Sequence, residues 1–125
     1  MNWLATLSPF GRNLQKTIEL SGRPIQISCT ARAMRALSQR GEPLIAEMEL
    51  AFACFARKAV YFHEQPSGQK LTFVTDKLAV CFHSVIPDHC ETGRETGALP
   101  SALRVTPRWL KLDYVNGGWK GEYGL

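Results

Sequence analysis

Residues 44–56 read LIAEMELAFACFA, and the conformation of this stretch decides how the rest of the chain can pack. Its Ala, Glu, Leu and Met content is typical of a helix. Its apolar residues nevertheless recur at every second position, with Glu47 and Glu49 on the opposite face, which is the pattern of a strand. We therefore predict a long strand. Because both of its faces become apolar from residue 51 onward, we expect it to lie inside a sheet or at a subunit interface.

A β-hairpin is predicted before this stretch. Residues 14–20 alternate between apolar and polar side chains, although Lys16 interrupts the pattern, and residues 25–29 alternate as well. The two segments are separated by Ser21-Gly22, which favours a tight turn.

Further hairpins are predicted toward the C-terminus. The alternating segments within residues 60–75 are separated by the polar loop 64–69, and Asp76-Lys77 is expected to turn the chain into the next strand. Asn116-Gly117 divides the aromatic-rich segment 109–123, and Asn-Gly is the strongest short hairpin signal.

The clearest helix is predicted over residues 31–40. Thr30 is a suitable N-cap, and Met34 and Leu37 fall on one apolar stripe. Gly41 is expected to end the helix in the left-handed conformation that glycine adopts easily.

Together these elements predict one α+β domain over residues 1–125. We expect a largely antiparallel sheet of six to eight strands, connected as hairpins or a meander, with the one principal helix on a sheet face. A partly closed barrel is the alternative. Residues 87–101 are polar and rich in Pro and Gly, which is typical of a long functional loop.

Composition supports a globular domain that needs no metal or disulfide to fold. The chain has 125 residues, of which 45% are hydrophobic and 21% charged. Its four cysteines are widely spaced, no signal peptide is visible, and no apolar run approaches the ~20 residues of a membrane span. We therefore expect a cytoplasmic protein with reduced thiols and no membrane contact.

The positive charge is concentrated in the first half of the chain. The net charge is +4, and residues 1–62 contain eight Lys and Arg against four Asp and Glu. The sequence offers a candidate anion-binding set on and near the predicted helix, made of Arg23, Arg32, Arg35 and Arg40. Such a basic face suits nucleic acid or another polyanion. The alternative is the ordinary solvated face of an amphipathic helix.

A second candidate site is a group of metal-ligating and nucleophilic side chains, Cys81, His83, His89 and Cys90. Two thiolates and two imidazoles suit tetrahedral zinc, and a neighbouring imidazole could activate a thiol. The spacing matches no established zinc pattern, however. Cys81 is alternatively a packed core residue, with His83 hydrogen-bonded and His89 solvated.

No catalytic motif accompanies these residues. The chain lacks a Gly-rich phosphate loop, G-x-S-x-G, H-E-x-x-H and C-x-x-C. The carboxylates of Glu47 and Glu49 could perform acid–base chemistry in a pocket or stand on a solvent-facing edge. The sequence thus favours a non-enzymatic cytoplasmic domain without a cofactor, acting through protein contacts or as a homo-oligomer through strand 44–55. Anion or nucleic-acid binding and a metal- or thiol-dependent site are the alternatives.

Overall fold

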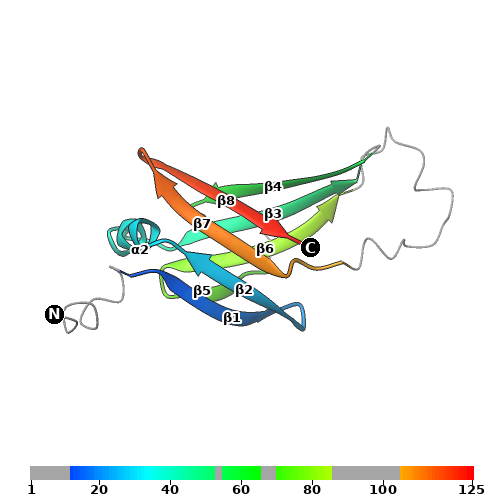
Figure 1. The fold of residues 1–125 in the computed structure, drawn as a ribbon, viewed down its shortest axis with the longest axis horizontal. Coiled ribbons are helices and arrows are strands. Elements are labelled where there is room, and N and C mark those ends of the chain that lie inside the picture. The colour runs from blue at the N-terminus through cyan, green and yellow to red at the C-terminus, as the bar shows by residue number, and fades with distance from the viewer. Residues whose placement is uncertain (1–11, 53–54, 66–69, 86–104) are drawn as a thin grey trace, which may run out of the picture.

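The computed structural model describes residues 12–52, 55–65, 70–85 and 105–125, which form eight strands and one helix, α2 (Ala31–Ser38) (Figure 1). The strands make two four-stranded sheets whose inner faces enclose the main core. Sheet A has the order β1 (Leu14–Leu20), β2 (Arg23–Cys29), β7 (Trp109–Val115), β8 (Gly118–Gly124). Sheet B has the order β4 (Ala56–His63), β3 (Leu44–Phe52), β6 (Leu78–Val85), β5 (Thr72–Thr75).

The α+β class and the number of strands are confirmed, but the largely antiparallel single sheet is not. Each sheet is mixed, because two antiparallel hairpins are joined through a parallel pair, β2 with β7 and β3 with β6. The two sheets remain separate, so the described strands do not form a closed barrel. Sheet B comes from the contiguous residues 44–85, whereas sheet A combines segments from either side of them.

Two of the predicted hairpins are confirmed, together with their turn chemistry. Ser21-Gly22 has φ values of 54° and 81°, and Asn116-Gly117 has 54° and 79°. Positive φ at both central residues matches the right-handed twist of the flanking strands. Asp76-Lys77 likewise joins the antiparallel strands β5 and β6.

The predicted hairpin across residues 64–69 is wrong. Strands β4 and β5 lie at opposite edges of sheet B and do not pair, because β3 and β6 lie between them (Figure 1). The inner face of β3 is buried from Leu44 to Leu50, and β6 is buried on both faces from Leu78 to Cys81, so the central positions withdraw the most apolar surface from water.

Residues 44–52 form the predicted strand, β3, in a central position. Ala46 and Met48 lie on its inner face in the core, while Glu47 and Glu49 face the other way. Residues 53 and 54 lie outside the described part, and Phe55 is 67% exposed beyond the strand end.

The helix is confirmed over Ala31–Ser38, two residues shorter than predicted. The hydroxyl of Thr30 accepts a hydrogen bond from the backbone N–H of Ala33, as expected of an N-cap, and Met34 and Leu37 are buried. The helix ends at Gln39 in the right-handed region, and Gly41 does not adopt a positive φ, so the predicted glycine cap is wrong. No helix in the described ranges is long and apolar enough to cross a membrane.

Two lysines bridge the sheets where their edge strands run side by side. Lys16 of β1 donates from Nζ to the carbonyl of Val74 in β5 at 2.8 Å. Lys58 of β4 donates to the carbonyl of Tyr123 in β8 at 3.1 Å. The interruption by Lys16 of the apolar alternation in its strand is therefore explained, since its ammonium group reaches a backbone acceptor of the other sheet.

We expect Lys16→Met and Lys58→Met each to lower the free energy of unfolding by about 0.5–1.5 kcal/mol, because methionine keeps the apolar stem but removes the hydrogen bond between the sheets. Urea denaturation measures the loss. Lys120→Met, which changes an exposed lysine of β8, is the control and should have little effect. Equal stability of all three variants would show that the bridges contribute nothing.

Candidate functional site

The outer face of sheet B carries a network of two carboxylates and two imidazoles, Glu47, Glu49, His63 and His83, called here the Glu–His network. Strand alternation turns the two glutamates of β3 away from the core. The parallel register sets His83 of β6 beside Glu49, and the antiparallel pair brings His63 from β4.

One carboxylate contacts both imidazoles. Glu47 Oε1 lies 2.6 Å from His63 Nε2, and Glu47 Oε2 lies 3.0 Å from His83 Nδ1. The second contact is not a hydrogen bond, because His83 Nδ1 has no partner of acceptable geometry. His83 Nε2 lies 3.3 Å from Glu49 Oε2. Glu47 is only 13% exposed on a strand paired on both sides, so the alternative of a solvent-facing edge is wrong.

Cys81 lies beside Glu47 in the parallel register but has the wrong environment for a nucleophile. It is buried with Ile45 and Ala79 beneath Leu71. Burial, and secondly the charge of Glu47, raise the pKa of the Cys81 thiol to about 11. A reactive thiol needs a lowered pKa.

Only half of the predicted metal-ligating group falls within the described residues. Cys81 and His83 share a sheet face as predicted, whereas His89 and Cys90 lie outside the described part. No group of three or more His, Cys, Asp or Glu in the described ranges is arranged to hold a metal ion. Sequence reasoning missed His63, because nothing in the sequence shows which strands flank β3.

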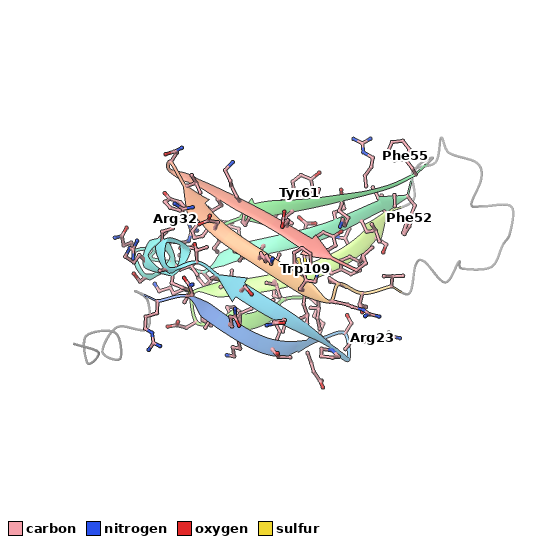
Figure 2. All side chains as sticks on the ribbon, in the orientation of Figure 1. Arg23, Arg32, Phe52, Phe55, Tyr61 and Trp109 are labelled. Carbon is pink, nitrogen blue, oxygen red and sulfur yellow. The ribbon has the colours of Figure 1, made fainter. Side chains whose placement is uncertain are left out.

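The four predicted anion-binding arginines are not brought together. Arg23 lies at the β1–β2 turn, at the end of the molecule opposite to Arg32 (Figure 2). Arg35 is exposed in the last turn of α2. Arg40 lies 3.6 Å from Glu64 and also donates to the carbonyl of Glu42.

Arg32 is held by a carboxylate of β7. Its Nε and Nη2 each donate at 2.8 Å to the two oxygens of Asp113. The Thr30 hydroxyl donates to the same carboxylate at 2.6 Å, and the backbone N–H of Tyr114 does so at 2.7 Å. These donors, Arg32 foremost, hold the pKa of Asp113 well below its usual range. The contact fastens the start of the helix to sheet A and occupies the guanidinium group that an external anion would need.

Comparisons with known proteins add no relative: no family model, no curated protein and no solved structure matches the chain. Function must therefore be argued from the surfaces of the molecule. Three cavities of about 860, 690 and 250 Å³ in the described part are lined by residues outside the Glu–His network.

We expect Asp113→Asn to destabilise the protein at neutral pH and to weaken the dependence of its stability on acid. A carboxylate whose pKa is depressed by folding stabilises the native state above its unfolded pKa of about 4, and that contribution is lost as the pH falls below it. Urea denaturation between neutral pH and about pH 2 measures the effect. The difference in free energy of unfolding between Asp113→Asn and the native sequence should shrink as the pH falls. A difference that does not change with pH would contradict the stabilising role of the Asp113 carboxylate. Glu19→Gln, at an exposed carboxylate, is the control.

The two cysteines of the described part should be inert in the folded protein. Burial raises the pKa of the Cys29 thiol to about 12, and it is also the main cause that raises the pKa of the Cys81 thiol to about 11. In a variant with Cys54→Ser and Cys90→Ser, a thiol reagent such as DTNB at pH 8 should label neither remaining cysteine until guanidinium unfolds the chain. Fast labelling of Cys81 in the native state would instead reveal an activated thiol.

Proposed function

We propose that this chain is a non-enzymatic interaction module that self-associates through the outer face of sheet B. The proposal is carried by the placement of exposed apolar side chains. Tyr61, Phe73 and Val85 are 47%, 54% and 37% exposed, and the strand registers set all three on that face. Several exposed apolar side chains on one face indicate a protein-contact surface, whereas single scattered ones are normal on any protein surface.

The polar centre of this face suits a second copy of the same chain. In a two-fold dimer each patch meets its own copy, so an effective patch must present complementary groups to itself. The Glu–His network contains both carboxylate acceptors and imidazole N–H donors within one patch. Two copies facing each other can therefore pair imidazole donors of one copy with carboxylate acceptors of the other.

The size of the face sets the expected strength. Three strands of about eight residues and the four residues of β5, spaced about 4.8 Å apart and rising about 3.3 Å per residue, give roughly 450 Å². A standard interface buries about 800 Å² on each partner. The face is therefore suited to a weak, reversible dimer with a Kd of tens to hundreds of micromolar, on the order of −5 to −6 kcal/mol.

The position of β3 changes how the self-association expected from strand 44–55 can occur. Both edges of β3 are already paired, with β4 and β6, so it cannot extend its sheet into another molecule. Its contribution to a dimer comes from its outer face, at Ala51 and the glutamates of the network. The proposed contact is therefore face to face rather than edge to edge.

Sedimentation equilibrium up to about 1 mM protein tests this proposal. The native sequence should show a monomer–dimer equilibrium, and Tyr61→Lys or Phe73→Lys should abolish it because a charge would be buried. Gln15→Lys adds the same charge to an exposed position on sheet A and should leave the equilibrium unchanged. A native protein that stays monomeric throughout, or equal association of all variants, would contradict the proposal.

A further inference from the structure

A second surface, on sheet A, is built from different residues. The β1–β2 hairpin and the segment leading into β7 border an open cavity of about 860 Å³. It is lined by Thr17, Arg23, Pro24, Gln26, Val105, Thr106, Arg108 and Leu125. Figure 2 shows Arg23 at this end of the molecule, away from α2.

The two arginines of this cavity have no paired carboxylate within the described part of the chain. The lining contains no Asp or Glu side chain. Within the described ranges no ion pair joins Arg23 or Arg108 to a carboxylate, whereas Arg32 and Arg40 each have one. The side chains that line the cavity therefore carry a net positive charge.

We propose that this cavity binds a small organic phosphate, with Arg23 and Arg108 donating to the phosphoryl oxygens. A guanidinium group presents N–H donors in a planar fork that matches phosphate oxygens in pairs. The hydroxyls of Thr17 and Thr106 and the amide of Gln26 supply further hydrogen bonds. This site is independent of the self-association proposed above, since the two surfaces share no residue.

The size and walls of the cavity favour an organic phosphate over a free inorganic ion. Small-molecule sites occupy about 300–1,000 Å³, and this cavity lies within that range. Inorganic phosphate would leave most of it empty. Pro24 and Val105 form apolar wall against which a sugar or base can pack.

The same features argue against a nucleic-acid surface. Nucleic-acid binding relies on an extended row of cations that neutralises several phosphates. Here the cavity holds two arginines, while Arg32 and Arg40 are engaged by Asp113 and Glu64. The charge thus suits one phosphoryl group or two adjacent ones rather than a polymer backbone.

Isothermal titration calorimetry at low salt tests the proposal with adenosine 5′-monophosphate, ribose 5-phosphate, inorganic phosphate and adenosine as probes. We expect the two organic phosphates to bind, inorganic phosphate to bind more weakly, and adenosine to show no binding. Arg23→Gln and Arg108→Gln should each weaken binding about tenfold or more through loss of a charge-assisted contact. Arg35→Gln, at an exposed helix arginine, is the matched control and should bind like the native sequence.

Circular dichroism establishes that the variants remain folded, and Arg23→Lys, which keeps the charge but not the fork, should bind with intermediate affinity. The proposal is overturned if no phosphate binds at about 10 mM, where a useful site would be saturated. It is also overturned if both glutamine variants bind like the native protein. Equal affinity for inorganic and organic phosphate would show that the cavity does not recognise the organic part of the ligand. Tight, steeply salt-dependent binding of duplex DNA that adenosine 5′-monophosphate does not displace would show that the arginines bind a nucleic acid instead.

Discussion

The two sheets depend on how their edges are joined. Each sheet ends in strands that have no hydrogen-bonded neighbour among the described residues on their outer side, and such edges invite pairing with other chains. Lys16 and Lys58 each place an ammonium group against a backbone carbonyl of the opposite sheet. In the same pair of strands, a Cβ at Gly121 would lie 3.0 Å from the Phe62 ring, so glycine lets β4 and β8 approach without displacing that side chain. Phe62 then stacks on Trp119 across the same seam at 6.2 Å between ring centroids.

The features that could be predicted from the sequence are those determined by residues close to one another in the chain. Asn116-Gly117 and Thr30 act on residues within a few positions of themselves, so the last hairpin and the start of the helix were predictable. The prediction of a hairpin across residues 64–69 was wrong because turn residues can reverse the chain direction without determining which strands pair. The partner of β3 is decided by the burial of its apolar inner face beside β6 at the centre of the sheet, and the resulting parallel register alone brings His83 to Glu49. Cys81 and His83 could be placed on one face by alternation, but His63 and the second cavity arginine, Arg108, could not.

The two proposed surfaces lie on different sheets. The Glu–His network and its exposed neighbours belong to the outer face of sheet B, and the arginine cavity is bordered by β1, β2 and the residues before β7. Packed sheets are separated by about 10 Å, and the core between them resists deformation. A dimer formed through sheet B therefore leaves the cavity open, so the module could hold a small anion and a second copy together.

The contiguity of sheet B has a consequence for biosynthesis. All of sheet B and the β1–β2 hairpin emerge from the ribosome before residues 109–124, which complete sheet A. During that interval β2 lacks its parallel partner, and Asp113 is not yet present to hold Arg32 and Thr30 at the start of the helix. Long-range pairings of this kind form late, and the nascent chain exposes apolar surface until they do. The β7–β8 hairpin can therefore complete sheet A only after every strand of sheet B and the β1–β2 hairpin have been made.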